Sequence, residues 1–235
     1  MERLDKRLAA TGRWSRREAR ELIRAGRVCI DGVPARAPED KVDDGARLTV
    51  DGEALGGPGS VYIMLHKPAG VVSATEDQRE KTVLDLLPEE YARAGLFPVG
   101  RLDKDTEGLL LLTNDGALAH AMLSPRRHVD KVYLARTAAP LTPADSLAFR
   151  QGVTLADGYT CQEADLEILP GGNEALVTIR EGKYHQIKRM MAARGNRVEY
   201  LKRLRMGSLT LDPELARGCW RLLTDQERTA LISSQ

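Results

Sequence analysis

The sequence predicts an α+β protein with two domains, and three features of its 235 residues support this prediction. Apolar residues recur at helical spacing near the N-terminus. Residues 52–60 are rich in glycine and lack a helical period, as in a flexible linker, which divides the chain into 1–58 and 59–235. Beyond this linker, short apolar runs bounded by turn residues alternate with helical patterns, which is typical of a sheet with flanking helices.

The small domain is predicted to contain two helices and a few short strands. Ser15 and Glu18 have the spacing of a capping box, so the second helix begins there, and Gly26 ends it. Strands are expected at 28–30 and 47–50, the first of them followed by an Asp-Gly turn.

One side of the second helix is strongly basic, because three of its arginines recur every four residues. A guanidinium group donates two hydrogen bonds to a phosphate, and such contacts position a protein on RNA without reading its sequence. An ordinary solvated helix would carry the same charges. The cations that we expect to contact RNA here are Arg13, Arg16, Arg17, Arg20, Arg24 and Arg27.

The net charge of +1 conceals an uneven distribution along the chain. Residues 1–36 hold 10 Lys/Arg and 5 Asp/Glu, a net of +5. Residues 180–205 hold 9 Lys/Arg and 2 Asp/Glu, a net of +7, which leaves the remainder at −11. Two basic regions on an otherwise acidic chain indicate a polyanion that is held at specific places.

Composition argues against several other classes of protein. No apolar run is long enough to span a bilayer, and the charged N-terminus has no signal peptide, so we expect a cytoplasmic protein without a membrane partner. The three cysteines show neither zinc spacing nor an even disulfide framework. No phosphate-loop or other cofactor motif is present, so we expect neither a metal nor a cofactor.

The large domain centres on a polar loop, residues 100–108, between two apolar runs. The flanking runs, 96–99 and 109–112, have the length and punctuation of buried strands. Three acids occupy alternate positions from 103 to 107; such acids commonly cap turns, and they are too few for a metal site. A polar loop between buried strands is also a common place for catalytic residues.

Other elements of the large domain follow from periodicity and turn residues. Strands are expected at 61–65, 131–134 and 174–180, and helices at 82–87, at 117–123, around 187–191 and from 224. Lys67, just after the first strand, is either an ordinary turn lysine or a contact to an RNA phosphate. If Val132 and Leu134 face the core, Tyr133 faces the other side of the sheet, where it is either half-buried or a platform for a base.

The loop sequence GRLDKDTEGLLLLTNDG resembles the signature loop of pseudouridine synthases, in the RsuA-type branch that modifies ribosomal RNA. The resemblance implies that Asp103 is the catalytic nucleophile and that Arg101 holds RNA where the target nucleotide leaves the stack. KVYL at 131–134 resembles the second family motif, which implies that Tyr133 lies in the active site. The strand and turn ending in HKPAG also resemble the family.

EGKYHQIKRM resembles the third motif of this family, in which a basic residue pairs with the catalytic aspartate. The match places that role on Lys188, where relatives commonly have arginine; lysine keeps the charge but loses the bidentate fork. Ile187 would pack beside the uracil pocket, and Arg189 would contact RNA. His185 is expected to be structural, because a single histidine without partners is weak support for acid–base catalysis.

The segment RLDKRLAATGRWSRREARELIRAGRVCIDG resembles the S4 RNA-binding domain. Together the motifs imply a mixed, mainly antiparallel sheet and isomerisation of uridine to pseudouridine at one uridine of 16S rRNA, the 516-type site. The expected partner is rRNA or a partly assembled small ribosomal subunit, bound by a monomer.

Three alternatives to this function stay open at this point. The first is a related enzyme that modifies 23S rRNA. The second is a non-catalytic S4-domain protein that binds rRNA during assembly, which explains the basic regions equally well but not the motifs of the large domain. The third is a glycosidase-like enzyme that uses Asp103 and Glu107 as paired carboxylates.

Overall fold

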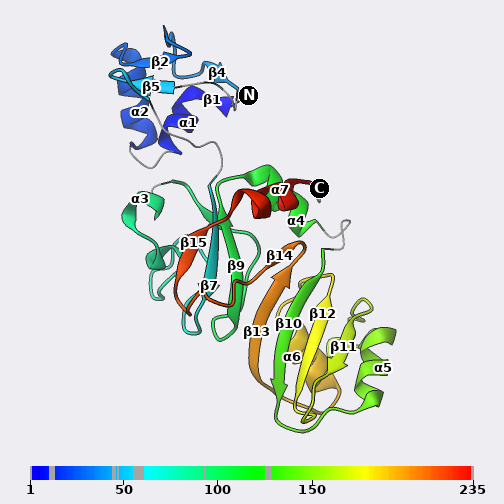
Figure 1. The fold of residues 1–235 in the computed structure, drawn as a ribbon. Helices are drawn as coiled ribbons and strands as arrows, with labels where there is room; N and C mark the ends of the chain where they lie inside the picture. The colour runs from blue at the N-terminus through cyan, green and yellow to red at the C-terminus, as the bar shows by residue number, and fades with distance from the viewer. Residues whose placement is uncertain are drawn as a thin grey trace.

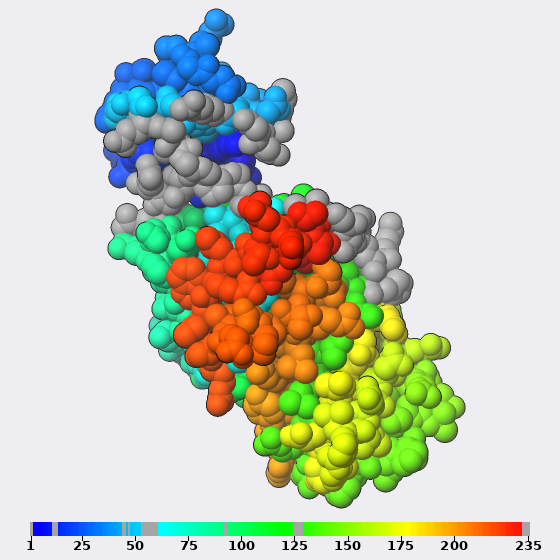
Figure 2. Space-filling model, in the orientation of Figure 1, coloured from blue at the N-terminus to red at the C-terminus, as the bar shows by residue number. Residues whose placement is uncertain are grey.

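The computed structural model describes residues 2–10, 14–43, 46, 48–54, 61–92, 94–124 and 129–233. The elements before residue 55 form a small group at one end of the molecule, and those after residue 60 form a larger group around a long sheet (Figure 1). In the space-filling view, the small group is a separate lobe, and the C-terminal residues cover part of one face of the larger group (Figure 2). None of the described helices is long and apolar enough to cross a bilayer.

The small group packs two helices against short strands. Its helices are α1 (Leu4–Ala9) and α2 (Arg16–Arg24); its strands are β1 (Glu2–Arg3), β2 (Val28–Ile30), β3 (Val33–Pro34), β4 (Lys41–Val42), β5 (Leu48–Val50) and β6 (Glu53–Ala54). The predicted capping box is confirmed: the Glu18 N–H donates to the Ser15 hydroxyl, and the Ser15 N–H donates to the Glu18 carboxylate. Leu4, Leu8 and Ile23 form the centre of a core in which all members come from residues 4–50.

The large group is built on one nine-stranded sheet. Its strands are β7 (Tyr62–Lys67), β8 (Phe97–Pro98), β9 (Glu107–Thr113), β10 (Lys131–Thr137), β11 (Asp165–Ile168), β12 (Glu174–Ile179), β13 (Val198–Met206), β14 (Leu209–Thr210) and β15 (Trp220–Leu222). Its helices are the 3₁₀ helix Leu84–Leu86 and α3 (Glu89–Ala92), α4 (Gly116–Leu123), α5 (Pro143–Gln151), α6 (Gln186–Ala193) and α7 (Asp225–Ser233).

The order across this sheet is β11-β12-β10-β13-β9-β7-β15, with β14 on β13 and β8 on β9. Every named pair is antiparallel except β13 with β9, so the predicted mixed, mainly antiparallel sheet is confirmed. The parallel contact is short, with Lys202 opposite Glu107 and Arg203 opposite Gly108. It joins the two halves of the sheet at the point where the polar loop enters β9.

Gly108 makes this junction possible. Its φ of +108° is accessible to glycine, and a Cβ added there would lie 2.2 Å from the carbonyl oxygen of Arg203. The backbones of β9 and β13 therefore approach more closely than any side chain at this position would allow.

Two details of the large group differ from the sequence prediction. Tyr133 and Ala135 point to the buried side of β10, whereas Val132 and Leu134 are only partly buried, so the expected core face was wrong. A register shift against β13 lies between Val132 and Tyr133, and alternation alone does not reveal such a shift. The expected helix at 82–87 is reduced to the single 3₁₀ turn Leu84–Leu86.

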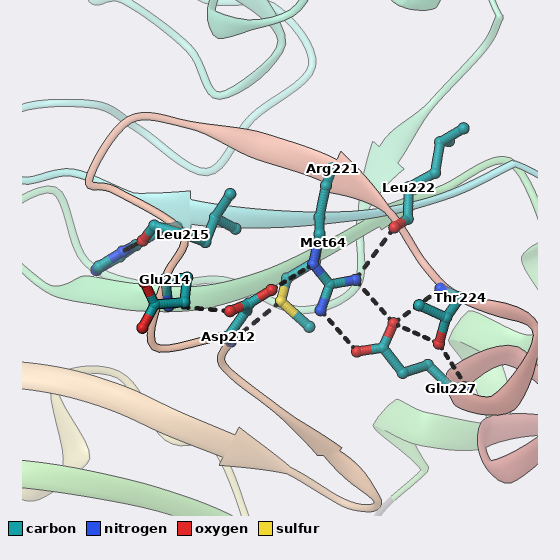
Figure 3. Close-up of polar contacts among 9 residues, drawn as sticks. Met64, Asp212, Glu214, Leu215, Arg221, Leu222, Thr224 and Glu227 are labelled. Carbon is teal, nitrogen blue, oxygen red and sulfur yellow. Dashed lines mark hydrogen bonds and ion pairs between the residues drawn. The ribbon is translucent and has the colours of Figure 1, made fainter.

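An arginine network fastens the C-terminal segment to the sheet (Figure 3). From β15, Arg221 donates to Asp212 at 2.7 Å and to both carboxylate oxygens of Glu227 at 2.8 Å. Glu227 also accepts from the N–H and hydroxyl of Thr224, which caps α7. The hydrogen bonds from Arg221 outweigh partial burial and hold the pKa of Glu227 at about 2.

This network gives the stability of the chain an acid dependence. The pKa of Glu227 is lower in the folded state than its ordinary value of 4.5, so its contribution is complete above pH 4.5 and is lost as the pH falls towards 2. Glu227→Gln is expected to lower the free energy of unfolding by about 1.5–3 kcal/mol at pH 6 and by less at pH 3. Urea unfolding at both pH values measures this difference, with Glu167→Gln, an exposed carboxylate on β11, as the control.

Candidate active site

The polar loop that precedes β9 is held from below by a buried lysine. The ammonium of Lys67, at the end of β7, donates to the carbonyl oxygens of Pro68 (3.0 Å), Asp103 (3.0 Å), Lys104 (3.3 Å) and Thr106 (2.9 Å). Its side chain is fully buried. Burial lowers the pKa of Lys67 to about 8, so the group is charged at neutral pH.

This position corrects one expected role of Lys67. A lysine with no exposed surface cannot reach an RNA phosphate, and its hydrogen-bonding capacity is already used by the loop. Lys67 is neither an ordinary turn lysine nor an RNA contact in this structure. It fixes the backbone on both sides of Asp103.

Ser73 fixes the other side of the same loop. Its hydroxyl donates to the carbonyl oxygen of Leu102 at 3.0 Å and accepts from the Leu102 N–H at 3.1 Å. Buried groups therefore fix both Leu102, which immediately precedes Asp103, and the backbone carbonyl of Asp103. The side chain of Asp103 points outward and is about a quarter exposed.

Lys188 brings the acidic loop and helix α6 together. Its ammonium lies 3.1 Å from the carboxylate of Asp103 and 2.5 Å from that of Asp105. Burial disfavours the charge on Lys188, but the two carboxylates outweigh it, so its pKa is raised. The hydrogen bond from Lys188 lowers the pKa of Asp105. Lys188 thus forms an ion pair with each of two carboxylates. A compact ammonium suits this arrangement, whereas a planar guanidinium suits bidentate contact with one carboxylate.

His185 also lies at this site, although the sequence suggested only a structural role. Its Nε2 lies 3.6 Å from the carboxylate of Asp103, and its ring stacks on Tyr184 with centroids 3.8 Å apart. It adopts a left-handed backbone conformation, φ 49°, at the N-cap of α6, a strained position for a residue other than glycine. Its neighbour Gln186 donates to Glu181, which anchors the turn before α6.

Asp103 opens into a small pocket of about 70 Å³. Buried apolar side chains of Ile187 and Leu201, together with the ring of Tyr133, form much of its wall. Polar and charged side chains make up the other half of the lining, and the Asp103 carboxylate is among them. The lining residues are Arg101, Leu102, Asp103, Thr106, Tyr133, Ile179, Gly182, Lys183, His185, Gln186, Ile187 and Leu201.

Other predicted residues lie at varying distances from this pocket. Arg101 is exposed and lines it, whereas Arg189 forms an ion pair with Asp157 at 2.5 Å. Arg13 lies outside the described residues. The other predicted arginines, on or next to α2 in the small group, are Arg16, Arg17, Arg20, Arg24 and Arg27.

Glu107 is not a second catalytic carboxylate beside Asp103. Its oxygens accept from the Tyr200 hydroxyl at 2.9 Å and pair with Arg217 at 3.1 Å, and it does not line the pocket. Burial alone would raise its pKa, but these hydrogen bonds lower it instead. Asp103 and Glu107 therefore do not form the paired-carboxylate arrangement of a glycosidase.

Comparison with known proteins agrees with this geometry. Residues 61–193 match the RNA pseudouridylate synthase family model, and residues 2–48 match the S4 domain model. The chain is 49% identical to YtzG of Bacillus subtilis, an uncharacterized RNA pseudouridine synthase, with 99% of each chain covered. It is 40% identical to the ribosomal small subunit pseudouridine synthase A of Escherichia coli K12, covering 98% of this chain and 100% of that protein.

A crystal structure of a pseudouridylate synthase gives the same result in three dimensions. It superposes with a TM-score of 0.69 at 35% identity, covering 98% of this chain and 100% of the other. The S4 domain, the family match over the catalytic sheet and the full-length similarity all agree. The chain therefore belongs to the RNA pseudouridylate synthase family and is an RNA pseudouridine synthase that carries an S4 domain.

Proposed function

We propose that this enzyme converts one uridine of 16S rRNA to pseudouridine, at the 516-type site, with Asp103 as the nucleophile. The observation that supports the role of Asp103 best is its carboxylate, paired with Lys188 at the mouth of the pocket between Tyr133 and Ile187. The choice of small-subunit rRNA is supported by relatives such as the Escherichia coli ribosomal small subunit pseudouridine synthase A.

The proposed reaction breaks the bond between N1 and C1′ of uridine and forms a bond between C5 and C1′. The C5 proton is released to solvent and N1 regains a proton, so the isomerisation balances without any co-reactant. The uridine must first leave the RNA stack, at a cost of a few kcal/mol, which phosphate contacts and pocket stacking offset. Tyr133 stacks on the base and Ile187 packs beside it, while Arg101 holds the strand at the pocket mouth.

Lys188 holds the Asp103 side chain in place beside the pocket. Its ammonium lies 3.1 Å from the Asp103 carboxylate and forms an ion pair with it. Because Lys188 also forms an ion pair with Asp105, its ammonium stays in place when the Asp103 carboxylate moves towards the substrate. Three first steps are compatible with this site: attack of the carboxylate on C1′, attack on the base, or removal of a ribose proton. Asp103 is the reacting side chain in each of them.

The small domain is proposed to hold rRNA through its arginines. Asp5 is fully buried and accepts from Arg3, Arg16 and Arg20, which are each about half exposed. Burial alone would raise the pKa of Asp5, but these three partners lower it well below its usual range. The buried carboxylate thereby holds neighbouring guanidinium groups in place on one surface, ready to meet phosphates. Arg17, Arg27 and Arg189 are proposed to add further phosphate contacts.

Arg24 offers a direct test of this proposed surface. It is exposed at the end of α2 and forms no ion pair within the described ranges. Arg24→Met is expected to weaken RNA binding and to reduce the slope of log affinity against log salt by about 1, the effect of losing one phosphate contact. Arg150→Met, which removes an exposed arginine from the last turn of α5, is the matched control. Equal effects of the two variants would contradict a specific role for α2.

Several further properties belong to this proposal. The domain boundary between residues 58 and 59 is supported by hydrophobic cores that do not mix residues from the two sides. We expect a monomer in the cytoplasm, where rRNA or a partly assembled small subunit is the substrate.

Tritium release tests the substrate. The enzyme is incubated with C5-tritiated transcripts of 16S rRNA, with partly assembled small subunits and with 23S rRNA. Release from 16S substrates alone is expected. Release from 23S rRNA alone would replace the small-subunit assignment with the large-subunit one. Tight binding without release from any substrate would contradict the proposed reaction and favour an assembly factor.

A further inference from the structure

A second and larger cavity adjoins the catalytic pocket. Its volume is about 440 Å³, within the range of small-ligand sites, which starts at roughly 300 Å³. The two cavities share Arg101, Tyr133, Gly182 and Lys183, so Tyr133 contributes to the walls of both. The reaction at Asp103 makes no use of this second space.

A buried guanidinium in the wall of this cavity lacks a full set of partners. Arg203 is only 1% exposed, and its Nε donates to the carbonyl oxygen of Leu109 at 2.8 Å. Its Nη2 has no hydrogen-bond partner among the described residues. Arg203 lies directly opposite Tyr133 across the β10–β13 pair, so both side chains are on the same face of the sheet. A buried guanidinium N–H without an acceptor is costly, and Arg203 keeps its positive charge in the wall of this cavity.

The rest of the lining is strongly positive. Lys131 is partly buried and donates to the carbonyl oxygen of Val129 at 3.1 Å. Burial lowers the pKa of Lys131, and the charge of Arg203 lowers it further, as expected for cations that face a common space. Lys183 adds another positive charge to the wall, whereas Arg180, which also lines it, is paired with Asp130 at 3.0 Å and with Asp165 at 3.5 Å.

The acid in the lining does not balance these charges. Glu181 accepts from the hydroxyl of Tyr159 at 2.7 Å, from the N–H of Gln162 at 2.9 Å and from the side chain of Gln186 at 2.7 Å. Its oxygens are therefore directed at neutral donors of the wall. Tyr159 is 37% exposed, and the ammonium of Lys183 lies 4.6 Å from its ring centroid. An aromatic ring beside clustered cations is the combination that binds the base and the phosphate of a nucleotide.

We propose that this cavity binds the nucleotide next to the target uridine, with its phosphate on Lys131, beside the buried charge of Arg203, and its base against Tyr159. The proposal rests on the proposed RNA reaction at Asp103. Because the two cavities share four lining residues, they adjoin each other, and a neighbour in the same RNA strand is therefore the ligand that we propose. The enzyme then extrudes two nucleotides from the RNA stack, and the second cavity contributes to the selection of the target uridine.

The test uses RNA hairpins that carry the uridine which the wild-type enzyme modifies. In two of them, the nucleotide immediately 5′ or 3′ of that uridine is replaced by an abasic residue. Single-turnover tritium release is measured for wild type, Lys131→Met and Tyr159→Ala. One abasic hairpin is expected to react about 10- to 100-fold more slowly with wild type, the loss typical of one stacked base. Tyr159→Ala should slow the intact hairpin similarly and the abasic one no further, because both changes remove the same contact.

Lys131→Met is expected to slow the intact hairpin about 10-fold, and Arg136→Met supplies its control. Arg136 is an exposed cation on the same strand, paired with Glu174 and absent from the cavity lining, so its loss changes the net charge equally. Additive effects of Tyr159→Ala and the abasic residue, or equal effects of Lys131→Met and Arg136→Met, would overturn the proposal. If the proposed 16S reaction is wrong, the wild-type enzyme releases no tritium from 16S rRNA. The hairpin is then designed from the RNA that the enzyme does modify.

Discussion

Asp103→Asn is expected to abolish pseudouridine formation, by at least about 10³-fold, without loss of the fold or of RNA affinity. Asparagine has nearly the same shape, and its amide oxygen can still accept from Lys188. An amide is not a nucleophile, however, so the step that detaches the base cannot begin. Lys188 keeps Asp105 as a partner, so no buried charge is left unpaired. Tritium release under single-turnover conditions measures the loss, and thermal unfolding and RNA binding verify that the variant is folded.

Asp105→Asn is the matched control for this variant. It removes a carboxylate from the same loop and from the same lysine, but Asp105 is 74% exposed and does not line the pocket. We expect a loss of less than about 10-fold, the effect of a less firmly held Lys188. If Asp105→Asn were inactive and Asp103→Asn active, the nucleophile would be Asp105, and the alignment of the loop with the family motif would be wrong.

Local sequence signals predicted the parts of the structure that depend on local interactions. The capping box at Ser15, the left-handed Gly26 after α2 and the leucine run of β9 each act within a few residues, and each appears in the structure. The three motifs also lie close together: Asp103 and Tyr133 line one pocket and Lys188 pairs with Asp103, although these residues are up to 85 positions apart in the chain.

Features that depend on distant contacts could not be predicted in this way. Strand β13 completes the sheet between β10 and β9, but its apolar positions are interrupted by charged residues, so no strand was predicted there. One of those charges, Arg203, is buried at the junction, and its role is apparent only when β10 lies beside it. Lys67 was taken for a surface lysine for the same reason, because the four carbonyl oxygens that it binds belong mostly to a loop some 36 residues further on.

Lys67→Met is expected to reduce both the stability and the activity of the enzyme. The methionine fills similar space, but the buried carbonyl oxygens of Asp103, Lys104 and Thr106 lose their donor. Each unsatisfied buried acceptor costs about 1–3 kcal/mol, and the loop can recover part of this by moving towards water, so we expect a net loss of about 3–5 kcal/mol. A shift of the nucleophile by only about 1 Å costs roughly 10²-fold in rate.

Two measurements separate this positioning role from a general loss of stability. At a temperature where urea titration shows Lys67→Met to be folded, its kcat is expected to be about 10²-fold lower while KM changes little, because the loop places Asp103 and does not bind RNA. Lys81→Met, which removes an exposed lysine from the large domain, should change neither value. A variant that is destabilised but retains full kcat when folded would show that Asp103 is positioned by Ser73 and Lys188 without Lys67. A rise in KM at unchanged kcat would instead return Lys67 to the RNA-binding role that its burial argues against.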